Sequence, residues 1–463
     1  MKTIFKQFLF FTMLLVILFN FVGCASRLGI EEFAYVIAIG LDMLDDSNLE
    51  LTLQFATASG GGSSDSSMQS TKINVSSVKC NSIDSGIALI NSHVSKKINL
   101  SHCQEIIISE ELARHGISEQ LDTLVNNTEL TNDAGIIISK CTAKEYIENV
   151  NPVFEGLLPQ FYKASLKTND YTAYSTNMNL ANFYCLLNDS YFQPYATIGN
   201  ILDNSKDNIK SESSDTSSEG SKNSSQQSSE SGNQASSSES SNNTKSSSSE
   251  SDNSEKNESS TKSKVPIQNS INANFIAGDY EVDDKNPIQT IGFAAFHDDK
   301  LVGEFTGLDS ICFLIINNEL EECTLSVPNP FKDGDYMDLY VASCQKTKCS
   351  VELSDSSTLI HVNIYLTGFG QSMDESISYG QDESVEKIEQ SAENYLKESI
   401  ENFLYKTSKE YNSDICGFGR FAVKHYLTME DWEKVNWLNN YKNSTFDVNV
   451  YFNVKAGNIF SET

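Results

Sequence analysis

Cysteine and histidine are the residues that could carry out chemistry in this chain, and their spacing favours no metal site or catalytic centre. The 463-residue sequence contains ten cysteines and six histidines. No two cysteines form a CxxC pair, and four residues without a nearby histidine separate Cys344 from Cys349, so the ligand spacing of zinc sites is absent. The histidines form no HExxH motif and are scattered over His93, His102, His115, His297, His361 and His425. We therefore predict no catalytic, cofactor-binding or metal-binding residues.

Two short motifs resemble ligand loops only in part. The sequence GFG at 417–419 is an isolated glycine pair, which is more typical of a tight turn before a helix than of a phosphate-binding loop. The sequence KDGDYMD at 332–338 lacks the glycine position and the closing Glu of an EF-hand loop. The sequence contains no GxSxG motif and no P-loop. We therefore expect a protein that is not an enzyme.

Cys24 is the one cysteine whose setting predicts a chemical role. The chain starts with Lys2 and Lys6, runs mainly apolar over 8–22, and reaches Cys24 directly after a small glycine. This run is shorter than the roughly 20 apolar residues of a stable transmembrane helix, and its layout is that of a cleaved export signal. A cleavage site followed by Cys resembles a bacterial lipoprotein box. We predict a signal peptide over 1–23 and lipid attachment at Cys24, through which diacylglycerol would hold the chain on a membrane. The alternative is an uncleaved anchor with an incidental cysteine.

The nine remaining cysteines are an odd number, and most of them lie in apolar runs, where Cys usually acts as a small buried hydrophobic residue. One disulfide bond stays open as a second interpretation. The cysteines in question are Cys80, Cys103, Cys141, Cys185, Cys312, Cys323, Cys344, Cys349 and Cys416.

Net charge excludes one class of partner. The formal charge is −30 and the isoelectric point is near 4.5, whereas a nucleic-acid partner would require a basic face. Residues 203–264 hold 11 acidic and 7 basic residues, a net −4, so −26 lies on the segments with a folded pattern. We predict no nucleic-acid partner and no broad electrostatic docking on anionic lipid.

The first part of the chain, 24–202, alternates strand and helix patterns. FAYVIAIGLD and NLELTLQFAT predict two strands joined by a turn at 45–48, because apolar residues alternate in the second of them. Helix patterns then follow at 81–96, 117–127 and 140–150, with apolar strand patterns between them at 105–109 and 134–139. This succession predicts an α/β or α+β domain with a sheet covered on at least one face.

Residues 203–264 are predicted to be disordered. Between 211 and 260, 24 of 50 residues are serine, and scarcely any apolar side chain offsets the entropy of ordering the chain. PYATIGNIL before this segment and INANFIAGDY after it both resemble strands. The segment is therefore either a linker between two domains or a long loop inside one domain, which loop-closure entropy tolerates.

The last part, 265–463, combines strand patterns with one long helix. QTIGFAAFHDDKLVGEFTG predicts two short strands around a turn at 298–300, and SICFLIINN at 310–318 predicts a further strand. More alternating segments precede an amphipathic helix over 383–411, and a final strand pattern begins at 446. The fold class predicted for the whole chain is α+β, with mixed or antiparallel sheets flanked by helices in two to three compact domains and a disordered Ser-rich insertion.

Four segments together resemble the Ger(x)C family of spore-germination lipoproteins, the C subunits of nutrient germinant receptors. The resemblance covers nearly all of the chain outside the Ser-rich segment, in the family's order. The segments are IEEFAYVIAIGLD at 30–42, NLSHCQEIIISEELARHGISEQLDTLVNNTEL at 99–130, IGFAAFHDDKLVGEFTG at 291–307, and DICGFGR at 414–420.

The sequence departs from the family pattern at a few positions. Ala25, Ser26 and Arg27 stand where the family tends to have a polar–aromatic pair, and Cys416 stands where Phe is usual. The Ser-rich segment is an addition.

The resemblance implies a non-enzymatic lipoprotein on the outer face of the inner spore membrane, without a cofactor. Its partners there would be the receptor's A subunit and permease-like B subunit. A second interpretation is an extracytoplasmic solute-binding lipoprotein, although the sequence lacks the internal repeat of two similar lobes.

Overall fold

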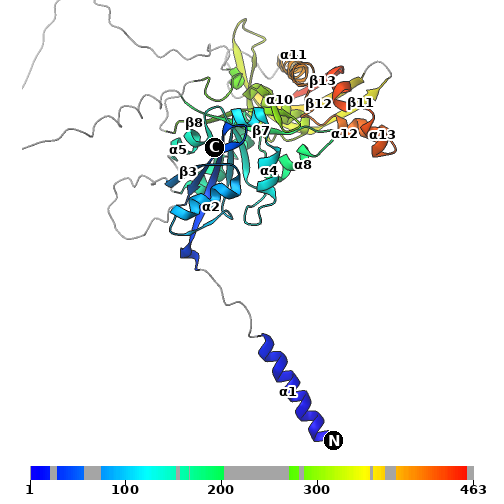
Figure 1. Cartoon of the computed structure of the whole chain (residues 1–463). Coiled ribbons are helices and arrows are strands. Elements are labelled where there is room, and N and C mark those ends of the chain that lie inside the picture. Colours follow the sequence, from blue (N-terminus) through cyan, green and yellow to red (C-terminus); the bar gives the residue numbers. More distant parts are fainter. Residues whose placement is uncertain are drawn as a thin grey trace, which may run out of the picture.

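Two β-sheets with flanking helices make up the chain in the computed structural model (Figure 1), which confirms the predicted α+β class. The structure describes residues 2–20, 29–56, 74–152, 157–165, 167–202, 271–280, 286–354, 358–370 and 382–455. Cys24 and the Ser-rich residues 203–264 lie outside this part of the chain, so lipid attachment and disorder remain predictions.

The larger sheet has nine strands in the order β3-β2-β1-β5-β6-β7-β8-β9, with β4 paired to β1. Its centre, from β1 through β5 and β6 to β7, is parallel, and its flanks are antiparallel. β5 and β6 are buried along their whole length, which explains their continuous isoleucine runs. The strands are β1 (Phe33–Asp45), β2 (Asn48–Phe55), β3 (Asn74–Cys80), β4 (Lys97–Asn99), β5 (Glu105–Ser109), β6 (Gly135–Ser139), β7 (Tyr195–Ile201), β8 (Ile288–His297) and β9 (Lys300–Phe305).

Short capped helices cover both faces of this sheet. Ser82, Ser109, Thr142 and Asn179 each accept a hydrogen bond from the backbone N–H three residues later, which fixes where α2, α3, α5 and α8 begin. α5 and α6 pack over a separate small core that includes Ile37, Ile107 and Ile137. The helices are α2 (Ile83–His93), α3 (Glu110–His115), α4 (Ser118–Val125), α5 (Ala143–Asn149), α6 (Leu158–Ser165), α7 (Asn169–Thr172) and α8 (Leu180–Leu187).

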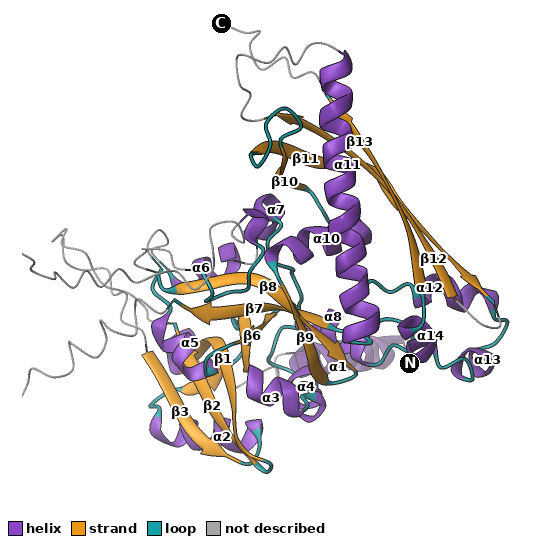
Figure 2. Ribbon diagram, turned by 90° about the horizontal axis from the view of Figure 1, so that it is seen from above, coloured by secondary structure: helices purple, strands orange, loops and turns teal. Residues whose placement is uncertain are grey.

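The smaller sheet has four strands in the order β10-β11-β12-β13, and the long helix α11 (Asp382–Tyr405) runs along it (Figure 2). The predicted amphipathic helix and final strand are thereby confirmed. Carboxylates of Glu393 and Glu389 on α11 accept hydrogen bonds from the N–H groups of Phe452 and Val454, at 3.0 and 2.8 Å, so the helix protects the sheet edge. The strands are β10 (Glu322–Pro328), β11 (Tyr336–Leu353), β12 (Thr358–Gly370) and β13 (Thr445–Val454).

The remaining helices lie between and beside the sheets. α10 (Gly307–Asn317) contacts strands of both sheets, and a π-helical turn at Lys406–Glu410 ends α11. Three short helices then precede β13: α12 (Gly419–Ala422), α13 (Met429–Glu433) and α14 (Trp437–Lys442).

The strand predicted at 310–318 is wrong, because most of this segment belongs to α10. Thr306 and Asp309 form a capping box at its start, and every turn of the helix is buried. A helix buried all round shows no amphipathic period, and its apolar run therefore resembles a buried strand.

The strand predicted at INANFIAGDY is also wrong. Residues 271–273 form a 3-10 turn, and Asn272 and Ala273 have positive φ angles of 55° and 50°. The polar edge strand β3, NVSSVKC, is a strand that the periodicity argument missed, since its alternation is weak.

β7 and β8 pair antiparallel, so strands from both sides of the Ser-rich segment lie in one sheet. The helix α1 (Lys2–Asn20) falls within the predicted signal peptide. In the described ranges, no helix combines the length and the hydropathy that crossing a bilayer requires.

α6 is fastened to the larger sheet by two polar contacts inside the small core. The Ser165 hydroxyl donates to Glu105 Oε1 at 3.0 Å, and the Tyr162 hydroxyl donates to Gln54 Oε1 at 2.7 Å. Burial raises the pKa of Glu105 from 4.5 to about 8, so this carboxyl group is protonated in the folded protein at neutral pH. Burial also raises the pKa values of Tyr162 and Cys103 nearby, so neither group gains a charge over this range.

Replacing Glu105 by Gln should change how stability depends on pH. The unfolded chain loses this proton near pH 4.5 and the folded chain near pH 8, so the free energy of unfolding falls as pH rises between these values. The free energy of unfolding of Glu105→Gln, measured relative to that of the wild type, should therefore rise by up to about 5 kcal/mol between pH 4.5 and pH 8. Denaturant unfolding at both pH values measures the change. Glu111→Gln, at an exposed position, is the control; an unchanged pH dependence in Glu105→Gln would contradict the assignment.

Candidate functional site

The hairpin of β8 and β9 brings together three of the four segments that resemble the family. Arg114 and Lys140 each bridge Glu110 and Glu304. Arg114 lies 2.7 and 2.9 Å from these carboxylates, and Lys140 lies 2.7 and 2.8 Å from them. Burial favours the neutral forms, but hydrogen bonds within the cluster outweigh it, so the pKa of Glu110 is lowered and that of Lys140 is raised. Glu110 and Lys140 therefore stay charged, and the four-residue cluster ties α3 and the end of β6 to β9.

The register of the parallel strands explains why Glu110 meets Lys140. Ser109 at the end of β5 pairs with Ser139 at the end of β6, so the next residues, of opposite charge, lie side by side. Sequence reasoning did not pair them. Aligning EIIISE with GIIISK as neighbouring parallel strands was the signal that could have found the contact.

The turn of the hairpin fixes the start of α4. Asp298 adopts a left-handed conformation with φ of 55°, as expected for Asp in a tight turn. The backbone carbonyl oxygen of Asp299 accepts a hydrogen bond from Ile117 N at 3.2 Å, and the Asp299 side-chain carboxylate accepts one from Ser118 N at 3.4 Å. The resembling segment at 291–307 thus positions the one at 99–130.

Asp414 organises the fourth segment, DICGFGR. Its carboxylate is fully buried and accepts three hydrogen bonds: from Phe418 N at 3.0 Å, from Gly419 N at 2.8 Å and from Trp437 Nε1 at 2.8 Å. Burial raises its pKa to about 6, while these donors act in the opposite direction. Gly417, with φ of 65°, forms a turn directly before α12, which confirms the predicted role of GFG.

The DICGFGR loop is bonded to the hairpin of the larger sheet. His297 Nδ1 lies 2.9 Å from the carbonyl oxygen of Asn412, and the Ser413 hydroxyl donates to the carbonyl oxygen of Phe296. Gln193 completes the contact, because its N–H donates to Asp414 O at 3.0 Å and its side chain accepts from Asp298 N at 2.7 Å. We call these hydrogen-bonded residues of the hairpin, Gln193 and the loop the motif junction.

The first resembling segment lies elsewhere on the sheet. Asp42, at its end, accepts hydrogen bonds from Ala143 N at 2.7 Å and Lys144 N at 3.0 Å, and so caps α5. Burial raises the pKa of Asp42 above its ordinary value. This carboxylate therefore has a structural partner.

The remaining candidate residues do not converge. Lys332 and Asp335 of the KDGDYMD motif pair at 2.7 Å in a turn between β10 and β11. His361 lies on β12, with Nδ1 2.8 Å from Asp447. Over the described ranges, no three His, Cys, Asp or Glu side chains are grouped as metal ligands.

None of the cysteines in the described part of the chain forms a disulfide bond. The buried ones are Cys80, Cys103, Cys312, Cys323 and Cys416, as expected for small apolar residues; Cys185 and Cys344 are exposed.

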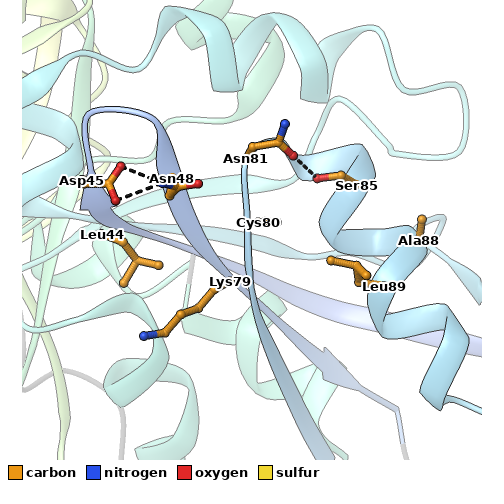
Figure 3. A pocket seen from close by; sticks show the side chains of 9 residues that line it. All are labelled: Leu44, Asp45, Asn48, Lys79, Cys80, Asn81, Ser85, Ala88 and Leu89. Carbon is orange, nitrogen blue, oxygen red and sulfur yellow. Dashed lines mark hydrogen bonds between the residues drawn. The ribbon is translucent and has the colours of Figure 1, made fainter.

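An open hollow of about 890 Å³ lies beside the turn between β1 and β2 (Figure 3). Its polar side chains bond one another: Asp45 accepts from Asn48 at 2.9 Å, and Ser85 donates to Asn81 at 2.8 Å. Lys79 and Leu89 complete the wall. The hollow thus offers few uncommitted polar groups to a ligand.

Comparison with known protein families identifies the family to which the chain belongs. Residues 26–201 match the spore germination protein N-terminal domain, and residues 291–457 match the spore germination B3/GerAC-like C-terminal domain. The chain belongs to the Ger(x)C family of spore germination proteins, and its role lies in germination.

Two curated relatives come from Bacillus subtilis (strain 168). The chain is 28% identical to spore germination protein KC over 136 residues, which cover 28% of this chain and 32% of the relative. It is 26% identical to putative spore germination protein YfkR over 202 residues, or 42% and 50% of the two chains. The matches thus span half or less of each relative. The crystal structure of the GerBC protein aligns with a TM-score of 0.45 and 11% identity, over 90% of this chain and 96% of that one.

Replacing Asp414 by Asn should destabilise the motif junction. The carboxamide nitrogen cannot accept the bonds that the carboxylate receives, so at least one buried donor loses its acceptor, at a cost of about 2–4 kcal/mol. Trp437→Phe removes only one donor and should cost about 1–2 kcal/mol. Denaturant unfolding measures both changes.

Trp432→Phe is the matched control for the loss of an indole hydrogen bond, since Trp432 Nε1 donates to the neutral Ser190 hydroxyl at 3.0 Å. If Asp414→Asn proved no more destabilising than Trp432→Phe, the central role of this carboxylate would be wrong.

Proposed function

We propose that this chain is a non-catalytic, lipid-anchored subunit of a germinant receptor that acts in receptor assembly or signal transfer. Membership of the germination family supports the receptor context. The observation that carries the non-catalytic role is the use of the polar groups at the motif junction. Asp414 and His297 there, and Glu304 in the neighbouring ion cluster, all bond other parts of the same chain, and among the described residues no nucleophile is paired with a base at these positions.

The proposed location is the outer face of the inner spore membrane. A diacylglycerol on Cys24 supplies two acyl chains, which suffice for stable anchoring. The net charge of −30 supports anchoring by lipid, because an acidic chain is repelled by anionic headgroups. Residues 25–32 would then form a short tether before β1.

The proposed partners are the receptor's A subunit and permease-like B subunit. The contacts of the hairpin favour a rigid body for this task, since they bond it to α3 and α4 on one side and, through the motif junction, to the DICGFGR loop on the other. A rigid subunit can pass on a displacement between partners without absorbing it. The second interpretation, a solute-binding lipoprotein, gains little support, because nine-stranded and four-stranded sheets are not two similar lobes.

Cys24→Ala should release the chain from membranes or leave it unprocessed, because no thiol remains to take diacylglycerol. Fractionation and intact-mass measurement of the membrane-bound chain test this. Cys185→Ala, which removes an exposed thiol of the folded part, should leave anchoring unchanged. Membrane retention of a cleaved Cys24→Ala product would contradict lipid anchoring.

Deletion of the gene should abolish the response of spores to the nutrient that this receptor recognises, and the wild-type gene should restore it. The tagged chain should co-purify with the A and B subunits from spore membranes. An undiminished nutrient response in the absence of any substituting paralogue would refute the receptor role.

A further inference from the structure

A cavity of about 570 Å³ lies between the end of α10, β11 and the region around α12, outside the contacts of the motif junction. Its volume falls within the roughly 300–1,000 Å³ of small-molecule sites. Tyr191, Ile316, Phe421 and Val423 supply apolar and aromatic wall. The cavity therefore has the size and lining of a site for a small organic molecule.

The charged groups that line this cavity are cationic, although the chain as a whole carries −30. Arg420 donates from Nε to Gly417 O and from Nη2 to Cys416 O, both at 3.0 Å, which leaves further N–H groups of its guanidinium uncommitted. Lys424 Nζ lies 5.0 Å from the centre of the Phe421 ring, and in the described ranges it has no hydrogen-bonded or ion-paired partner. Two cations at one small cavity favour an anionic ligand.

Two carboxyl groups near Arg420 limit the charge of that ligand. Partial burial raises the pKa of Asp189, and the Arg420 guanidinium acts in the opposite direction. The side chain of Glu319 is more exposed, and Arg420 acts on its pKa in the same direction as on that of Asp189. The field of Arg420 is thus partly compensated, which favours a single negative charge placed towards Lys424.

Asn317, the last residue of α10, adds an unsatisfied amide to the cavity wall. Its Oδ1 and Nδ2 atoms are both shielded from solvent, and neither has a hydrogen-bond partner in the described part of the chain. The neighbouring amide of Asn318, by contrast, has a partner, because its Oδ1 accepts a hydrogen bond from Thr347 N. A shielded amide without partners costs free energy, and no hydrogen bond prevents its side chain from turning into the cavity.

We propose that this cavity binds a small organic carboxylate, with Lys424 and the free guanidinium N–H groups of Arg420 at the carboxylate and the Asn317 amide at a neighbouring polar group. The aromatic and aliphatic wall then takes a compact apolar part of the ligand. Carboxylate is the anion that suits a planar guanidinium fork, one ammonium group and a mostly apolar wall. The site goes beyond the proposed function, since neither anchoring nor receptor assembly depends on it.

The test uses thermal unfolding and calorimetry of the full chain in detergent. The probes are apolar monocarboxylates of graded size (propionate, isovalerate, benzoate and phenylacetate), the primary amides of any that bind, and acetate and inorganic phosphate at matched ionic strength. At least one of these apolar monocarboxylates should raise Tm by several degrees in a saturable manner, and its amide should not. Failure of every apolar monocarboxylate, or an equal effect of phosphate, would overturn the proposal.

Three variants assign the binding to this cavity. Asn317→Leu removes the unpaired amide at similar volume, so it should abolish binding and raise Tm of the free chain by about 2–4 °C. Lys424→Met should weaken binding by about tenfold or more at unchanged Tm of the free chain. Lys79→Met, at the exposed lysine of the other hollow, is the matched control and should bind as the wild type does. Arg420 is left intact because it holds the DICGFGR loop.

Equal binding by Lys424→Met and Lys79→Met, or retained binding by Asn317→Leu, would place the ligand elsewhere and refute the site. Germination assays keep this result separate from the receptor role. A chain that binds none of the monocarboxylates but restores the nutrient response would refute the carboxylate site alone.

Discussion

The antiparallel pairing of β7 with β8 is the constraint on which the rest of the architecture depends. It joins Tyr195 to Ala295 and Ile201 to Ile288, so that the strand before the Ser-rich segment and the strand after it share one sheet. The two family matches divide the chain in this region, since the first ends at 201 and the second begins at 291. The C-terminal match therefore contributes the hairpin of β8 and β9 to the sheet that the N-terminal match builds.

That hairpin brings three of the four resembling segments close together in space, although they are far apart in sequence. One end of it meets α4, its β9 strand meets the ion cluster with Glu110, and His297 meets the loop of Asp414. The partly exposed ion pairs each contribute little, about 0–1 kcal/mol for a surface pair. The buried Asp414 carboxylate contributes more to specificity, because three donors converge on it and each would be unsatisfied without it.

The cationic cavity lies next to this arrangement without belonging to it. Arg420 serves both, since its bonds to carbonyl oxygens stabilise the turn at Gly417 and its side chain also lines the cavity. A ligand there would contact residues at the end of α10, on β11 and around α12, and α10 contacts strands of both sheets.

The sequence by itself determined the elements with a clear period. Alternation in LELTLQF and the 3.6-residue period from 383 onward predicted β2 and α11, because apolar residues recur in each segment with the period of its own secondary structure. The family segments contain His297, Asp298 and Asp414 of the motif junction, whereas Gln193, Asn412 and Ser413 lie outside all four segments. Where burial is complete, as in α10, local pattern could not distinguish helix from strand, and the capping box and the surrounding sheets decided it. Only the tertiary structure brought Asp414 to Trp437, Glu304 to Arg114, and Asn317 to Lys424, because contacts between distant residues depend on strand order and register, which local sequence does not encode.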